Sequence, residues 1–169
     1  ERVVPAIKIA SFHLTQDSLL KKAAETKIPI ILSTGMSTSE EVDHAVALLK
    51  NMDAKFALLQ CTSSYPTALE DINLSVIAEY KKKYDCVVGY SGHENGVSIA
   101  ACSIFFGGSI IEKHFTLDRT MKGPDHASSL EVKGLRMLVE RLREQEIAIG
   151  SPYKKVLECE KANLKKFRS

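Results

Sequence analysis

Five short apolar runs recur along the chain, and their spacing limits the possible fold more than any other feature. The runs are Ala6–Ala10, Pro29–Leu32, Phe56–Gln60, Cys86–Tyr90 and Ser109–Glu112. Successive runs begin about 23 to 30 residues apart, which is the repeat of a βα unit. They are almost continuously apolar instead of alternating, as expected for parallel strands that are covered on both faces. The pattern therefore predicts an α/β fold with a parallel sheet.

Segments with a helical spacing of apolar residues fill the gaps between the runs. Thr15 is expected to cap the first helix, and Ser37 with Glu40 has the spacing of a capping box for the second. The stretch Val97 to Phe106 is apolar nearly all round, which predicts a deeply buried helix. A further helix is expected over Leu130 to Ile147.

Polar residues follow each apolar run. They include Ser11 and His13, the stretches 33–35 and 61–66, then 91–93 and 113–116. Hydroxyls, histidines and glycines at the carboxyl ends of all five strands suggest the active face of a parallel barrel. An open doubly wound sheet is the alternative, but it would concentrate its glycines after one strand, and here they are spread over several.

Composition and charge exclude some classes of function. The net charge of +2 is too small to imply nucleic acid, and no apolar run approaches the roughly 20 residues of a membrane helix. The four cysteines form no CxxC pair, so a reducing, cytoplasmic setting is expected. A late basic run is interpreted as a solvated face; it consists of Lys154, Lys155, Lys161, Lys165, Lys166 and Arg168.

His93 and His114 are the clearest candidate metal ligands. Each stands at the end of its strand, and because the strands are consecutive, a right-handed crossover makes the two histidines neighbours. Two imidazoles can share one divalent ion and leave positions open for substrate and water. The alternative is two unrelated histidines, one of which caps the helix that follows.

Four serines and a lysine are candidates for an anion pocket. Each hydroxyl can donate one hydrogen bond to a phosphate or carboxylate, and an ammonium supplies the countercharge. The alternative is that serines are simply common at strand ends and helix caps. The set is Lys8, Ser11, Ser33, Ser63 and Ser91.

Glu112 and Asp125 are candidates for acid/base chemistry or for contact with sugar hydroxyls. Glu112 lies two residues before His114, so both point to the same side of the strand. Its alternative role is a salt bridge with a lysine, whereas Asp125 follows a Gly-Pro pair where an aspartate is ordinary. Tyr65 could contact a sugar or only pack.

Taken in order, these residues resemble the sialic acid synthase family, which includes legionaminic and pseudaminic acid synthases. Six motifs carry the resemblance: KIAS (8–11), ILSTGM (31–36), QCTSSYP (60–66), GYSGHE (89–94), IEKHFTLD (111–118) and KGPDHASSLE (122–131). The resemblance implies a (β/α)8 TIM-type barrel of which about five βα units, strands 4 to 8, are present. It also implies that residues 1–149 belong to the barrel. Residues 150–169 would then be a linker toward an antifreeze-like domain absent from this sequence.

The resemblance also implies roles for individual residues. His93 and His114 would bind Mn²⁺ or Mg²⁺, and the lysine and serines of the anion pocket would hold phosphoenolpyruvate. Tyr65, Glu112 and Asp125 would surround the sugar. His13 stands where many members of the family carry an acidic residue, so a catalytic role is expected there with a different substrate or acid/base step.

The implied activity is condensation of phosphoenolpyruvate with an N-acetylmannosamine-type amino sugar, free or 6-phosphorylated, with release of phosphate. The parent enzyme is expected to be a cytoplasmic homodimer. Two alternatives stay open: a metal-dependent barrel hydrolase, and a non-catalytic fragment that binds a metal or a partner.

Overall fold

Five parallel strands in chain order form the centre of the structure, a computed structural model that describes residues 4–168. The strands are β1 (Ile7–Ile9), β2 (Ile30–Ser33), β3 (Phe56–Cys61), β4 (Val87–Gly92) and β5 (Ile110–Lys113). Each predicted apolar run is therefore a strand, with bounds that differ by two residues at most. The predicted parallel α/β sheet is confirmed.

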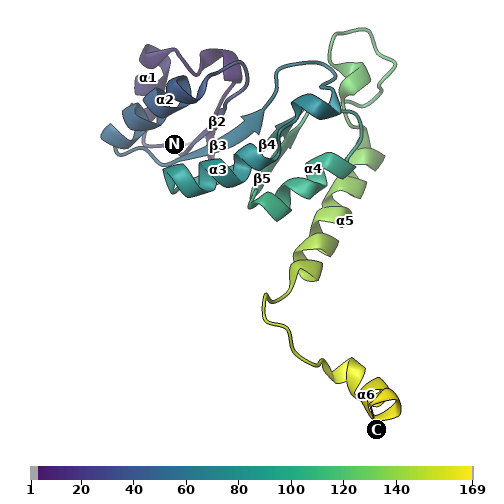
Figure 1. The fold of residues 1–169 in the computed structure, drawn as a ribbon. Helices are drawn as coiled ribbons and strands as arrows, with labels where there is room; N and C mark the ends of the chain where they lie inside the picture. The colour runs from purple at the N-terminus through teal and green to yellow at the C-terminus, as the bar shows by residue number, and fades with distance from the viewer. Residues whose placement is uncertain (1–3, 169) are drawn as a thin grey trace.

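Each pair of consecutive strands is joined by a helical crossover, because parallel neighbours cannot be connected by a tight turn. Figure 1 shows these helices alongside the sheet, with α1 and α2 packed against each other. They are α1 (Asp17–Glu25), α2 (Ser39–Asn51), α3 (Ser75–Tyr84) and α4 (Ser98–Cys102), and α5 (Val132–Ile149) follows β5.

The sheet is strongly curved, as a contact between its two outermost strands shows. In a flat sheet β1 and β5 would lie about 19 Å apart, four steps of about 4.8 Å each. Nevertheless Lys8 Nζ on β1 lies 3.3 Å from Glu112 Oε2 on β5. Two extended side chains cannot span the flat distance, so the strands must curve toward each other. The five βα units thus form a half-barrel whose inner face carries both residues.

Two apolar clusters hold the helices against the sheet. One joins α1 and α2 to β1–β3 and includes Leu20, Leu32 and Leu49, which are fully buried. The other packs α3, α4 and α5 against β4, with Ile77 and Leu138 among its buried members. Apolar burial therefore runs the length of the outer face of the sheet, and polar side chains gather at the carboxyl end of its inner face.

The first two helices start later than the sequence suggested. The prediction of a Thr15 cap is wrong, because α1 begins at Asp17 and its N-cap, Gln16, makes no side-chain capping bond. The capping box of α2 is present but one residue further on: Thr38 Oγ1 accepts from the Glu41 amide, and Glu41 Oε2 accepts from the Thr38 amide. The same spacing occurs in both registers, and extended backbone at Thr38 selects the second.

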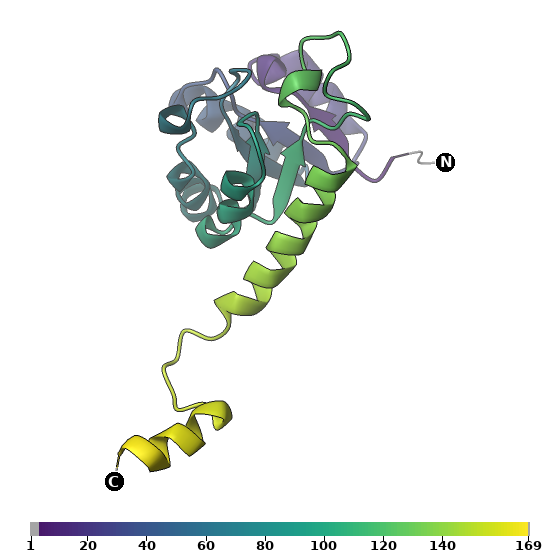
Figure 2. The same ribbon diagram turned by 90° about the vertical axis from the view of Figure 1, so that its right-hand side faces the viewer.

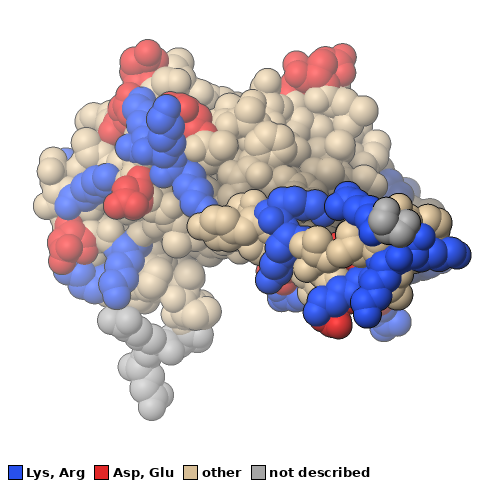
Figure 3. All heavy atoms as spheres, turned by 60° about the horizontal axis from the view of Figure 1, so that its bottom comes forward, with Lys and Arg blue, Asp and Glu red and all other residues tan. Residues whose placement is uncertain are grey.

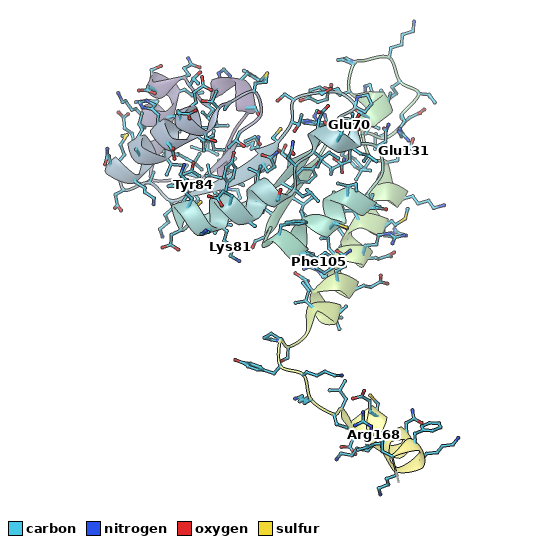
Figure 4. All side chains as sticks on the ribbon, viewed as in Figure 1. Glu70, Lys81, Tyr84, Phe105, Glu131 and Arg168 are labelled. Atoms are coloured by element: carbon cyan, nitrogen blue, oxygen red, sulfur yellow. The ribbon has the colours of Figure 1, made fainter. Side chains whose placement is uncertain are left out.

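The predicted helix from Val97 to Phe106 is only partly correct. It is a short α4 followed by a 3₁₀ turn over Ser103–Phe106, which Gly107 ends at a φ of +90°. Ala100 and Ala101 are buried, but Phe105 is 57% exposed and lies at the surface (Figure 4). The tighter winding changes which face meets the core, so the expected burial all round does not occur.

The C-terminal part of the chain leads away from the sheet. Figure 2 shows α5 extending past the strands toward the tail, which ends in the short helix α6 (Lys161–Phe167). Side chains of the tail are almost all exposed, and its lysines and arginine gather around α6 (Figure 3). This supports the interpretation of the basic run as a solvated face; that residues 150–169 serve as a linker stays a prediction. Within residues 4–168, no helix combines the length and apolar character needed to cross a membrane.

Replacing Thr38 with alanine should destabilise the protein by about 1 kcal/mol, because α2 loses its side-chain cap. Chemical denaturation of the full-length protein, monitored by circular dichroism, measures the free energy of unfolding. Thr15→Ala is the control, since Thr15 caps nothing, and we expect it to leave that free energy unchanged. Equal losses in both variants would contradict the assignment of the cap.

Candidate functional site

A cavity of about 630 Å³ opens at the carboxyl ends of the five strands. Its wall contains residues from all five strand ends and from the loop that follows β5. Every residue that the sequence assigned to substrate or metal lines it: Lys8, Ser11, Ser33, Ser63, Tyr65, Ser91, His93, Glu112, His114 and Asp125. The curvature of the sheet has thus brought residues more than a hundred positions apart into one pocket.

His13 is the exception among the predicted residues. It does not line the cavity; its Nδ1 lies 2.8 Å from Gln16 Oε1, and its ring packs against Phe12. Residues 11 and 13 would share a face in a strand, but Ser11–His13 is a 3₁₀ turn, which separates their directions. The geometry does not support the catalytic role predicted for His13, and that role stays a prediction.

His93 and His114 face each other across the cavity wall. Their ring centroids are 5.3 Å apart with the planes at 63°, and the Tyr65 ring lies 4.1 Å from His93 and 5.6 Å from His114. His93 is 7% exposed, so its ring is held almost completely by protein. Consecutive strand ends have placed the two imidazoles as the sequence predicted.

Hydrogen bonding fixes which nitrogen of His93 is available to a ligand. Its Nδ1 lies 2.9 Å from the Thr62 carbonyl oxygen, which can only accept, so Nδ1 carries the proton. Nε2 is then unprotonated in the neutral ring and free to bind a metal. His114 Nδ1 lies 3.8 Å from Asp125 Oδ2, beyond hydrogen-bond distance.

The donor set fits an ion bound by two imidazoles and otherwise by substrate or water. Among residues 4–168, no three or more His, Cys, Asp or Glu side chains come together as a metal cluster. A carboxylate-rich metal centre within this segment is therefore not what the geometry offers. The two histidines therefore remain candidate ligands of a divalent ion.

Burial and hydrogen bonds act in opposite directions on the ionisation of His93 and Cys61. Burial lowers the pKa of His93. Its contacts with the Cys61 thiol and the Thr62 carbonyl raise that pKa by more than burial lowers it, so the net shift is upward. For Cys61, burial raises the pKa, while hydrogen bonds with His93 and Ser11 produce a net lowering. Cys61 Sγ lies 4.0 Å from His93 Nδ1, so each group favours the charged form of the other.

The serine hydroxyls line the same cavity as the histidines. Ser11, Ser33 and Ser91 are all at least 90% buried, yet their side chains line the cavity. Ser11 Oγ accepts a hydrogen bond from the Gly35 amide at 2.9 Å, and Ser33 Oγ donates to Glu112 Oε2 at 3.4 Å. Hydroxyls that are buried but face an open cavity are suited to donate to an anion.

Glu112 forms the salt bridge with a lysine that the sequence suggested as its alternative role. The lysine is Lys8, which lies on β1, at the opposite edge of the sheet from β5. Lys8 and Glu112 keep about a third of their side-chain surface exposed, at 33% and 39%. An ion pair in that setting contributes little to stability. Both groups can therefore exchange partners with a charged ligand at small cost.

The sequence interpretation missed several residues of the wall. Cys61 was taken for a core residue, and it is buried, but it also lines the cavity beside His93. Its position two residues before Ser63 at the end of β3 was the available signal, because alternation puts both on one face. Phe12 and Met36 also line the cavity while two thirds exposed, and nothing in the sequence distinguished them.

Comparison with known proteins identifies relatives over most of the chain. The NeuB family model matches residues 1–154. The N-acetylneuraminate-9-phosphate synthase of Homo sapiens is 41% identical over 160 residues, covering 94% of this chain and 45% of that protein. The N,N'-diacetyllegionaminic acid synthase of Campylobacter jejuni is 39% identical over 160 residues, with 93% and 48% covered.

A solved structure extends the likeness to three dimensions. The N-acetylneuraminic acid (sialic acid) synthetase of Leptospira borgpetersenii, in complex with citrate, is 36% identical and superposes with a TM-score of 0.89. The match covers 99% of this chain and 59% of that one. The chain spans about half the length of the curated relatives it matches.

Gly35→Ala should weaken binding of a small anion without unfolding the protein. A Cβ at this position would lie 2.3 Å from Ser63 Oγ and 2.9 Å from Ser11 Oγ, so the methyl group would displace both hydroxyls. Loss of about one hydrogen bond, 1–2 kcal/mol, corresponds to roughly 5- to 30-fold weaker affinity. Isothermal titration calorimetry of the full-length protein with inorganic phosphate measures this affinity.

Gly134→Ala on α5 is the matched control, because its Cβ would meet only the Leu130 side chain at ordinary to slightly tight distances. We expect its phosphate affinity to equal that of the unaltered protein. An unchanged phosphate affinity in Gly35→Ala would show that the Ser11 and Ser63 hydroxyls do not bind the anion.

Proposed function

The chain belongs to the NeuB family, and we propose that the protein containing it condenses phosphoenolpyruvate with an N-acylated amino sugar of the N-acetylmannosamine type. The observation that carries the proposal is the composition of the cavity. The Lys8 ammonium and the hydroxyls of four serines lie in the same pocket as two imidazoles and two carboxylates. The names of the relatives, synthases of sialic and legionaminic acids, agree with this activity.

Phosphoenolpyruvate has two anionic ends, and the cavity offers donors for both. In this proposal the Lys8 ammonium neutralises charge, and the serine hydroxyls at positions 11, 33, 63 and 91 donate to phosphate and carboxylate oxygens. Anchoring both ends fixes the direction of C3, the carbon that attacks. The donors therefore act mainly by orientation.

His93 and His114 would hold the divalent ion, Mn²⁺ or Mg²⁺. When bound, such an ion acts as a Lewis acid that polarises an aldehyde oxygen. The protein's own contribution is to keep the two rings in place: the Thr62 carbonyl fixes the tautomer of His93, and Tyr65 packs against both rings.

The remaining polar residues suit the sugar and the proton transfers. C3 of phosphoenolpyruvate forms a bond to the aldehyde carbon of the open-chain sugar, whose oxygen takes up a proton. Water adds at C2, and the C2–O bond to phosphate breaks, which releases inorganic phosphate. In this proposal Glu112 and Asp125, which line the cavity, accept and return these protons, and Tyr65 contacts the sugar. Burial raises the pKa of Tyr65, so this hydroxyl stays protonated as a donor.

The segment is proposed to be the last five βα units of an eight-stranded barrel. The support is the open half-barrel, in which β1 and β5 each have one unpaired edge within the described residues, and the partial coverage of longer relatives. A linker function for residues 150–169, a cytoplasmic location and a homodimeric parent complete the proposal. A barrel hydrolase is less well supported, because residues 4–168 offer no metal cluster with a carboxylate.

His93→Ala and His114→Ala, each made in the full-length protein, should abolish metal-dependent formation of the sugar acid. The reason is that neither remaining imidazole alone provides a two-ligand site. Product formation from phosphoenolpyruvate and N-acetylmannosamine, with Mn²⁺ supplied after chelation, gives the measurement. His44→Ala on α2 is the control, since His44 pairs with Asp17 at the surface. Normal turnover and metal content in both cavity variants would refute the metal assignment.

Residues 1–169 expressed alone should neither form a monomeric cooperative fold nor make product. Closure of a barrel fixes strand number, tilt and shear together, and five strands leave two edges that associate with other chains. Analytical ultracentrifugation and thermal unfolding test this directly. A monomeric, cooperatively folded and active 169-residue protein would contradict the proposal that strands are missing.

A further inference from the structure

A buried ionic cluster adjoins the two candidate metal ligands, and one of its members, Lys113, also lines the cavity. Glu94 follows His93 in the chain, and Lys113 precedes His114. The Lys113 ammonium lies 3.1 Å from Glu94 Oε1 and donates to the Glu94 backbone carbonyl at 2.7 Å. Their side chains are only 3% and 1% exposed. Thus each member of the pair is the direct neighbour of one histidine.

Tyr90 completes the cluster from within β4. Its hydroxyl donates to Glu94 Oε2 at 2.8 Å, and its ring is buried in the core between β4 and helices α3–α5. Gly92 makes room for this contact, because a Cβ there would lie 2.4 Å from both Glu94 Oε2 and the Tyr90 ring. Gly92 lies between the pocket residues Ser91 and His93. A larger residue is excluded there because its side chain would point away from the pocket, into the contact between Tyr90 and Glu94.

Stability does not account for such a cluster. Removing two charges from water costs about as much as their attraction returns, and apolar replacements of buried ion pairs are often as stable or more so. What the pair does provide is a fixed distance between the end of β4 and the end of β5. Those two ends carry the imidazoles.

We infer that Glu94, with Lys113 and Tyr90, is a positioning residue that sets the separation and orientation of the His93 and His114 rings. This rests on the proposed function, in which these rings hold a divalent ion. Glu94 does not line the cavity, so it would contact neither the ion nor the substrate directly. It acts through the backbone of its neighbour and through the strand end that Lys113 belongs to.

The chain provides a matched control away from the cavity, where a partly exposed ion pair contacts a buried tyrosine. Asp43 on α2 pairs with Lys83 at 2.7 Å and accepts from the Tyr84 hydroxyl at 2.9 Å, the same three groups as in the buried cluster. Tyr84 is labelled in Figure 4, on α3. This second cluster lies away from the cavity, whose lining includes none of its residues.

The test compares Glu94→Gln and Tyr90→Phe with Asp43→Asn and Tyr84→Phe in the full-length protein. Ring signals of ¹⁵N-labelled histidine, in the metal-free protein, report ring position. Affinity for Mn²⁺ alone, from the electron paramagnetic resonance of the free ion, reports the site. We expect both buried-cluster variants to shift or broaden the His93 and His114 signals and to weaken Mn²⁺ binding about 10- to 100-fold. The Asp43→Asn and Tyr84→Phe variants should change neither the ring signals nor the Mn²⁺ affinity.

Each outcome decides the inference. If Glu94→Gln folds and keeps the ring signals and the Mn²⁺ affinity, the cluster is merely structural and the inference is overturned. If Glu94→Gln does not fold, Tyr90→Phe, which removes one hydroxyl, decides by the same two measurements. If the unaltered protein binds no Mn²⁺, the metal part of the proposed function fails, and the ring signals alone decide the positioning role.

Discussion

The curvature of the sheet is the constraint on which the site depends. Lys8 and Glu112 belong to strands that a flat sheet would keep far apart, and their 3.3 Å contact measures how far the inner face has closed. The same curvature brings Ser33 within reach of Glu112 and turns five strand ends toward one cavity. Parallel strands contribute because all their carboxyl ends lie at one edge. Curved parallel pairing thus converts five short motifs into one pocket.

Much of this was predictable because strands and strand ends obey simple rules. Continuous apolar runs at a βα repeat gave the five strands, and alternation after each run placed Ser91, His93, Glu112 and His114 on one side. The rules failed where backbone left regular geometry. Ser11–His13 turns as a 3₁₀ segment, which directs His13 toward Gln16 instead of the cavity. A capping box that fits two registers likewise needs the tertiary fold to select one.

The contacts on the outer side of the strand ends were less predictable, because no sequence spacing indicates which of these residues meet. Lys113 lies within a strand where an apolar residue is the rule, and Glu94 stands in the turn that follows β4. Only the fold shows that they meet, at 3.1 Å and almost without solvent. Burial lowers the pKa of Lys113, and the nearby Glu94 carboxylate opposes this shift without reversing it. A charged pair at such depth exists only because both partners are present.

The two ion pairs near the cavity therefore differ in how well they tolerate the loss of one partner. On the inner face, Lys8 and Glu112 are partly exposed, and a ligand can take over their pairing at small cost. On the outer face, removing one partner leaves the other charge buried and unpaired, which is strongly unfavourable. Glycines occur where each face is most crowded: Gly35 leaves room for two hydroxyls, and Gly92 for the Glu94 carboxylate. Substitutions of Lys8 or Glu112 are therefore expected to change ligand binding more than folding. A single substitution of Glu94 or Lys113 is expected to destabilise the strand ends that carry the histidines.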